Sequence, residues 1–280
     1  MIYAFMTVMG LACMLPMLLV AMVSVTDEKV LAQNGYSLLP AGFSLYAYSL
    51  IFTDSSPVAG SYLVSITVTV TGTLAAVLIT AMAAFALANR QVRHRNALAL
   101  FFFITMVFNA GLVPWYMVCR ALHLTDNLLA LIVPSLLFSP FNLFLVRNFM
   151  NGIPDSLMES ARIDGASDPV ICFRVYFPLC TPVLATITLF YGVAYWNDWF
   201  NAIMLVNNNK LYPLQYLLYK IQSEIRMLAQ LATGTTTPRA LPTDSFKMAT
   251  AIVTIGPILL LYPYLQRYFI KGLTIGSVKG

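Results

Sequence analysis

Residues 147–178 read RNFMNGIPDSLMESARIDGASDPVICFRVYFP, a polar stretch inside an otherwise very apolar chain. Four of the eleven acidic residues of the chain lie here, so acidic charge is concentrated in one short segment: Asp155, Glu159, Asp164 and Asp168. Ser156 is followed three residues later by Glu159, a capping-box pattern just after Pro154. The stretch therefore predicts a helix over residues 154–164.

The residues after this helix predict a tight turn and a second helix. Gly165 can adopt the left-handed conformation that closes a helix. Asp168 followed by Pro169 is typical of an N-cap and first turn, and Pro178 is expected to end the second helix. A polar helix-turn-helix between membrane spans is suited to contact with a partner in the aqueous phase, so this segment is the main indication of function.

The composition places the rest of the chain in a membrane. Hydrophobic residues make up 59% and charged residues 10%, with a mean hydropathy of +0.78, which excludes an ordinary water-soluble domain. We predict one all-α domain covering residues 1–280, a bundle of about six spans. The predicted spans are residues 2–24, 62–88, 97–118, 128–146, 181–206 and 246–265. The first is expected to be a retained helix, because it lacks the basic flank of a signal peptide.

Several predicted spans contain proline or glycine, namely Pro16, Gly72, Pro114, Pro134 and Pro140. Such residues are tolerated where neighbouring helices or cavity water satisfy the freed backbone groups. A bundle with broken helices suits a transport path better than a plain membrane anchor.

Basic residues give the orientation. Arg90, Arg93 and Arg95 crowd the loop after the second span, which predicts that this loop and residues 147–178 are cytoplasmic. Residues 207–245 are then an extracytoplasmic loop, within which residues 211–231 are predicted to form an amphipathic surface helix. Residues 207–247 carry five basic and two acidic side chains. This surplus would attract an acidic docking protein or an anionic saccharide, or it is ordinary surface charge.

The spacing within residues 147–178 resembles the cytoplasmic loop of permease subunits of binding-protein-dependent ABC importers. That signature is Glu-Ala-Ala, three residues, Gly, nine residues, and Ile-x-Leu-Pro. Here Glu159-Ser160-Ala161 precedes Gly165 by three residues, and Val175-Tyr176-Phe177-Pro178 follows after nine. The departures are Ser160, Val175 and Phe177. Residues 161–167 and the ending, residues 266–280, resemble the carbohydrate class of these permeases.

The resemblance implies an ABC importer permease fold with a cytoplasmic coupling helix-turn-helix. The chain has no P-loop, so it is not itself expected to be an enzyme, and ATP and Mg would be bound by two partner ATPase subunits. The first helix would dock into an ATPase cleft, with coupling residues Glu159, Ser160, Ala161, Asp164, Gly165 and Pro178. The alternative is an amphipathic loop lying on the membrane, with Leu157, Met158 and Ile163 facing lipid.

The resemblance also implies the tail contact and the other partners. Gly272, Gly276 and Lys279 would reach the ATPase interface, unless the tail is simply a flexible end. Further partners are a related second permease subunit, an extracytoplasmic solute-binding protein and membrane lipid, in a multi-pass protein of the bacterial inner membrane. Residues 23–28 and 34–36 with Pro40 resemble a branch that imports complex saccharides, including acidic alginate. The expected cargo is an oligosaccharide, with an anionic one favoured.

The end of the fifth span supplies candidate residues for the substrate path. Aromatic rings beside amide, hydroxyl and carboxylate groups suit a sugar, and at helical spacing several of these residues share one face. The candidates are Tyr191, Tyr195, Trp196, Asn197, Asp198 and Asn201. An interfacial aromatic belt is an equally good interpretation. Asn109, Trp115 and Asn142 are secondary candidates that are more typical of helix packing.

Other functions find little support in the sequence. The four cysteines show no metal or redox spacing, the two histidines are far apart, and no nucleophile–base set or nucleic-acid motif occurs. No cofactor or metal is expected in this chain. A secondary transporter would need intramembrane ionisable groups and a repeated fold, and only Asp198 falls in a predicted span. A permease for a different solute remains an alternative.

Overall fold

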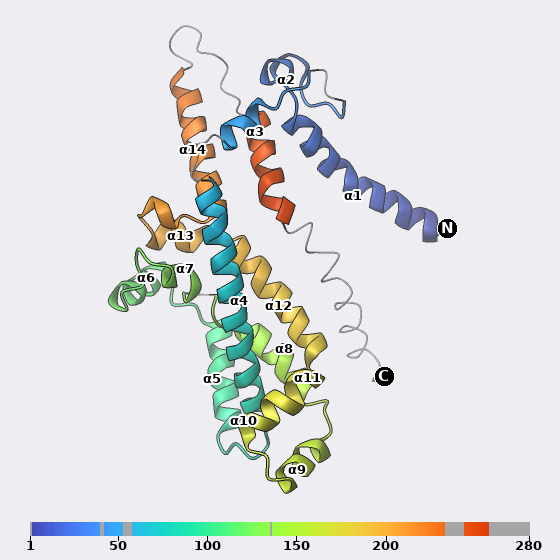
Figure 1. Cartoon of the computed structure of the whole chain (residues 1–280), viewed down its shortest axis with the longest axis vertical. Helices are drawn as coiled ribbons and strands as arrows, with labels where there is room; N and C mark the ends of the chain where they lie inside the picture. Colours follow the sequence, from blue (N-terminus) through green and yellow to red (C-terminus); the bar gives the residue numbers. More distant parts are fainter. Residues whose placement is uncertain (1, 40–41, 53–57, 135, 233–243, 258–280) are drawn as a thin grey trace. The chain divides into compact units, whose positions relative to one another are not determined.

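The computed structural model describes residues 2–39, 42–52, 58–134, 136–232 and 244–257, and within these ranges the regular elements are helices (Figure 1). One isolated antiparallel bridge pairs Thr26 with Phe43. The described residues fall into two compact units, those within residues 1–63 and 212–257 and those within residues 64–211. Each unit is described by itself.

The first unit contains the beginning and the later part of the chain. Its helices are α1 (Ile2–Ser24), α2 (Glu28–Asn34), α3 (Tyr46–Ile51), the start of α4 (Val58–Ala88), α14 (Leu214–Ala232) and the helical residues 244–257. Asp27 caps α2 by accepting a bond from the backbone N–H of Lys29 at 2.9 Å. α14 confirms the predicted amphipathic helix. It starts three residues late because Pro213, which has no N–H, fits only at a helix start.

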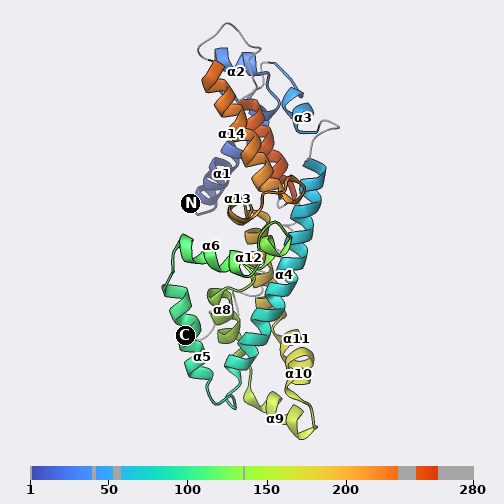
Figure 2. The ribbon, with the colours of Figure 1, turned by 90° about the vertical axis from the view of Figure 1, so that its left-hand side faces the viewer.

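The second unit holds the rest of α4 and the middle of the chain. Its other elements are α5 (Arg95–Val107), α6 (Leu112–Ala121), α7 (Leu129–Ile132), α8 (Pro140–Met150), α9 (Asp155–Ile163), α10 (Asp168–Val170), a π-helix (Ile171–Tyr176), α11 (Phe177–Leu179), α12 (Thr181–Trp196), α13 (Phe200–Leu205) and a 3₁₀ turn (Asn209–Leu211). Helix α8 packs against α5 and α12, and α13 packs against α6 and α7 (Figure 2).

Two of the predicted spans are continuous helices. α1 matches the first span, and α4 matches the second but starts at Val58 rather than residue 62. With 31 residues and a rise of 1.5 Å per residue, α4 is about 46 Å long. It therefore extends beyond a hydrocarbon core of about 30 Å. The sixth span is helical at residues 244–257, and its remainder lies outside the described residues.

The third, fourth and fifth predicted spans each contain a break between two helices. Residues 97–118 form α5 and α6, which meet at 118°. Residues 128–146 divide into α7 and α8, and residues 181–206 divide into α12 and α13. The described part of the chain has two helices long and apolar enough to cross a membrane, or up to four if each bent pair is one span. At the first break, the Asn109 side chain replaces a helical bond by accepting from the N–H of Gly111 at 2.8 Å.

Candidate functional site

The predicted helix-turn-helix is present. It consists of α9, a turn, and a continuous helical stretch over residues 168–179. We call residues 155–179 the coupling segment. α9 ends at Asp164, and Gly165 follows with φ of +81°. The Gly165 N–H donates to the carbonyl of Arg162, and the Ala166 N–H donates to that of Ala161, both at 2.9 Å. This is a Schellman closure, and it confirms the prediction that Gly165 closes the first helix.

The capping-box prediction at the start of α9 is wrong. Pro154 is the N-cap residue and makes no side-chain cap bond, and Ser156 lies in the first turn of the helix. The extended backbone of Pro154, with ψ of 132°, already sets the helix entry. Asp155 in the first turn carries a negative charge that favours this end of the helix dipole.

The two faces of α9 differ. Met158 is buried against the rest of the unit, with 8% of its surface exposed. Glu159, Ser160 and Asp164 are exposed, and Ile163 is 87% exposed. Because Met158 is covered by protein while Ile163 is open, these residues do not form one apolar face toward lipid. α9 instead presents a mixed polar and apolar surface.

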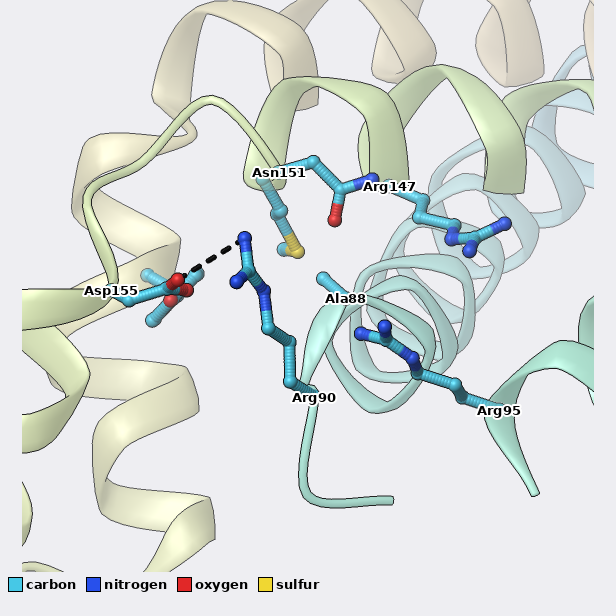
Figure 3. A pocket seen from close by; sticks show the side chains of 8 residues that line it. Ala88, Arg90, Arg95, Arg147, Asn151 and Asp155 are labelled. Carbon is cyan, nitrogen blue, oxygen red and sulfur yellow. Dashed lines mark ion pairs between the residues drawn. The ribbon is translucent and has the colours of Figure 1, made fainter. Parts of the chain in front are cut away.

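Two ion pairs hold the coupling segment. Arg90, which follows α4, contacts the Asp155 carboxylate at 3.2 Å (Figure 3). Arg162 on α9 contacts Asp168 across the turn at 3.0 Å. The Arg162 side chain is only 22% exposed, so the second pair fixes the two helices of the segment against each other.

The second helix begins and ends one residue away from the prediction. Ser167 is the N-cap and Asp168 is the first helical residue. Pro178 lies within α11, and the chain bends by 85° between Leu179 and α12. Proline is compatible with the first turn of α11, so Pro178 does not stop the helix.

The second helix is anchored in the core. Ile171 is fully buried, and the buried ring of Tyr176 packs edge-on against Phe85 of α4, with centroids 5.1 Å apart. The second helix therefore contacts α4 directly and leads, through the bend at Cys180, into α12.

The aromatic candidates of the substrate path lie in what we call the α12–α13 joint (residues 191–208). Tyr191 and Tyr195 are both buried. The Tyr191 hydroxyl lies 2.7 Å from the Thr80 hydroxyl and accepts from the N–H of Ser139 at 3.0 Å. The Tyr195 hydroxyl donates to the carbonyl of Ile132 at 2.8 Å. Both tyrosines therefore join α12 to other segments, and their contact with cargo stays a prediction.

Close packing of α12 on α4 occurs at Gly72. A Cβ atom on this glycine would lie 2.6 Å from the ζ carbon of Tyr195. No real side chain sits at that distance, so glycine is required here for the tyrosine ring to reach its place.

The prediction that Asp198 shares a helix face with Tyr191 and Tyr195 is wrong, because α12 ends at Trp196. Asp198 accepts bonds from the N–H groups of Phe200 at 3.1 Å and Asn201 at 3.2 Å, and so caps α13. The amide of Asn201 donates to Asp198 at 2.8 Å and to the carbonyl of Pro134 at 3.2 Å. Asn201 is buried, and its Oδ1 atom has no hydrogen-bond partner among the residues that the structure describes.

The remaining candidates are dispersed. Trp196 is buried and Asn197 is exposed. The ring of Trp115 packs on Phe200 with centroids 5.6 Å apart, and Asn142 is buried on α8. Trp115 and Asn142 are therefore placed as packing residues. Asn109 accepts its bond from a backbone N–H at the break between α5 and α6. Gly272, Gly276 and Lys279 lie outside the described residues.

Sequence reasoning missed Asp126, which has φ of +54°. Its carboxylate accepts bonds from the N–H groups of Asn207 and Asn208, and its own N–H donates to the carbonyl of Leu205 at 2.9 Å. The bonds from these two N–H groups lower the pKa of the Asp126 carboxyl. Its partners are some eighty positions away, so no local pattern could have indicated the contact.

Comparison with known proteins agrees with this architecture. Residues 76–275 match the family described as binding-protein-dependent transport system inner membrane component. The polygalacturonan/rhamnogalacturonan transport system permease protein YtcP of Bacillus subtilis is 37% identical over 286 residues, covering 100% of this chain and 97% of that protein. The arabinooligosaccharides transport system permease protein AraQ of Halalkalibacterium halodurans is 29% identical, covering 95% of this chain and 91% of that protein.

A solved structure shares the fold. It is a crystal structure of a bacterial ABC transporter involved in the import of the acidic polysaccharide alginate, with a TM-score of 0.82 and 29% identity. The match covers 95% of this chain and 94% of the other. With the broken-helix bundle and the coupling segment, these findings identify an inner-membrane protein: the chain belongs to the family of permease subunits of binding-protein-dependent ABC importers.

Proposed function

We propose that this chain is the permease subunit of an ATP-driven importer of an oligosaccharide or polysaccharide fragment. It would pair with a related second permease, two ATPase subunits and an extracytoplasmic solute-binding protein. ATP and Mg would be held by the ATPase subunits, and α9 would receive their movement.

The observation that carries this proposal is the construction of the coupling segment. α9 is joined to the protein by Met158 and two ion pairs, while Glu159, Ser160 and Ile163 remain open on one side. The second helix, by contrast, is buried at Ile171 and Tyr176. An exposed helix on a rigid stem is suited to transmit the movement of a partner, because force on α9 reaches α4 and α12 without being lost in a flexible loop.

An acidic saccharide is the favoured cargo. The relative YtcP is named for polygalacturonan and rhamnogalacturonan, and the similar structure belongs to an alginate importer. Galacturonan and alginate are polymers of acid sugars, so their fragments carry carboxylates. In this chain Lys210 and Arg226 are exposed on the segment after α13 and on α14, where they would favour an anion or an acidic binding protein.

The coupling proposal is tested with matched glycine variants in the assembled complex. Gly165 and Gly35 both have positive φ, +81° and +71°, and neither has an atom within 4 Å of an added Cβ. Gly165→Glu should abolish binding-protein-stimulated ATP hydrolysis and transport. Gly35→Glu also places a side chain at a positive φ, outside the coupling segment, and should leave both nearly unchanged. Equal activity of the two variants would contradict the assignment of α9 as the docking helix.

The cargo is tested separately with the wild-type complex in proteoliposomes. Oligogalacturonate, oligoalginate and neutral arabino-oligosaccharide are added with the cognate binding protein, and ATP hydrolysis is measured. Stimulation by the acid sugars supports an anionic cargo. Stimulation by the neutral sugar alone would still support a saccharide importer but would contradict the preference for an anionic cargo. If none of the three stimulates ATP hydrolysis, the cargo is not one of these saccharides.

A further inference from the structure

A cavity of about 360 Å³ lies in the second unit, where the end of α4 meets α5, α8, α9 and the π-helix. Its size is within the roughly 300–1,000 Å³ that is typical of small-ligand pockets. Figure 3 shows Ala88 in the middle of the view, with the side chains of Arg90, Arg95 and Arg147 around it. The lining residues are Ala88, Arg90, Arg95, Arg147, Met150, Asn151, Asp155 and Tyr176.

The cavity has an excess of positive charge. Three guanidinium groups face one carboxylate, so three minus one leaves a net charge of +2 on the lining. Arg90 is paired with Asp155 at 3.2 Å. Among the described residues, neither Arg95 nor Arg147 takes part in an ion pair.

Arg147 shows an unmet hydrogen-bonding requirement. Its Nε atom is buried and has no hydrogen-bond partner within the described part of the protein. A buried donor on a charged group is costly to leave unpaired. An anion bound beside Arg147 would balance the surplus positive charge around this donor.

We propose that this cavity binds a phosphate group, held by Arg95 and Arg147 with help from Arg90. Guanidinium groups present several N–H donors in a planar fork that matches phosphate oxygens. In the predicted orientation the cavity lies at the cytoplasmic ends of α4 and α8, where the phosphates of anionic lipids occur. The same chemistry fits a soluble phosphate, so both sources are tested.

A bound phosphate would also compete with Asp155 for Arg90. Because that ion pair holds the start of α9, occupancy would loosen one of the two charged ties of the coupling segment. This consequence rests on the proposed function of α9, whereas phosphate binding itself does not.

Binding is measured on the purified full chain in its complex. Native mass spectrometry in mild detergent compares retention of phosphatidylglycerol with that of neutral phosphatidylcholine, and a parallel titration with inorganic phosphate follows thermal stability. Two variants remove the site in different ways. Arg95→Gln with Arg147→Gln removes two cations, and Ala88→Leu fills the cavity while keeping every charge. Arg93→Gln is the matched control, because Arg93 is exposed in the same loop and does not line the cavity.

The expected result is phosphatidylglycerol retention that falls on the order of ten-fold in both site variants and is unchanged in Arg93→Gln. Stabilisation by inorganic phosphate with the same dependence on the variants would support the site and identify a soluble ligand. Equal loss in Arg93→Gln would show a general charge effect and overturn the proposal. Absence of both lipid and phosphate binding to the folded wild-type complex would overturn it as well. ATP hydrolysis in the Arg93→Gln complex shows separately whether the importer is intact.

Discussion

The coupling segment and the α12–α13 joint are both breaks between helices of the second unit, yet they are built in opposite ways. α9 buries Met158 and is otherwise held by ion pairs at the surface. The joint buries Tyr191, Tyr195 and Asn201, whose polar groups bond to other segments. The difference indicates that the joint stabilises the bundle, whereas the outer face of α9 stays exposed, as the proposed docking to an ATPase subunit requires. Substitutions should therefore separate transport from stability.

The largest expected effect is on transport, at the exposed face of α9. Glu159→Lys should lower ATP-driven transport on the order of ten-fold or more, because a reversed charge at an interface costs several kcal/mol. The free energy of unfolding should change by less than about 0.5 kcal/mol, because the side chain is exposed. Uptake in proteoliposomes and thermal unfolding measure the two. Glu224→Lys on exposed α14 is the control, and an equal transport defect there would remove the distinction between the regions.

The largest stability effect is expected where α12 packs on α4. Gly72→Ala should destabilise the protein by about 1–3 kcal/mol, because the new methyl group overlaps the Tyr195 ring. Gly60→Ala on the same helix meets nothing within 4 Å and should be neutral or slightly stabilising. Unfolding in a denaturing detergent measures both. If Gly60→Ala proved as harmful as Gly72→Ala, close packing at the joint would not be the cause.

A smaller loss of stability is expected for Tyr191→Phe. The change removes a hydroxyl that bonds Thr80 and the N–H of Ser139, at a cost of about 1 kcal/mol. Tyr3→Phe, at a side chain that is 89% exposed, should cost nothing measurable. The same unfolding assay compares them. A Tyr191→Phe protein that is as stable as wild type but defective in uptake would instead indicate that this tyrosine belongs to the substrate path.

The smallest expected effect concerns pH at the end of the joint. Bonds from Asn207 and Asn208 lower the pKa of Asp126 in the folded protein below its unfolded value. Its ionised form therefore adds stability at neutral pH, and this contribution disappears as pH falls from about 4 through the folded pKa. The melting temperature of wild type should exceed that of Asp126→Asn at pH 6, and the gap should be narrower at pH 3 than at pH 6. A gap that is equally wide at both values would show that ionisation is not involved.

Local sequence predicted the coupling segment well because its structure depends on neighbouring residues. Gly165 adopts the left-handed backbone conformation that closes α9. Its N–H bonds to the carbonyl of Arg162, and the N–H of Ala166 bonds to the carbonyl of Ala161. The errors there were of one residue, at Ser167 and Pro178, or concerned which residue caps α9. Hydropathy likewise predicted α1 and α4, since each is a long uninterrupted apolar helix.

The breaks in the other spans could not be located from the sequence. The carbonyls of Ile132 and Pro134, near the break between α7 and α8, are satisfied by Tyr195 and Asn201 from more than sixty positions away. The short helix α13 is placed by Asp198, and the chain after it by Asp126. A hydropathy profile predicts one span for each of these stretches. It contains no information on which distant group bonds to a backbone carbonyl that a break leaves without a helical partner.

The amino-acid sequence alone predicted an apolar helical chain, a polar helix-turn-helix within residues 147–178 and a glycine turn at Gly165. These features follow from composition, periodicity and backbone preferences within a few residues. The three-dimensional structure was needed to locate the breaks in the spans and to show that Tyr191 and Tyr195 join helices. It was also needed to show that Arg90, Arg95 and Arg147 line one cavity. The physical reason is that a broken helix or a shared cavity is stable only when residues distant in sequence supply the missing partners.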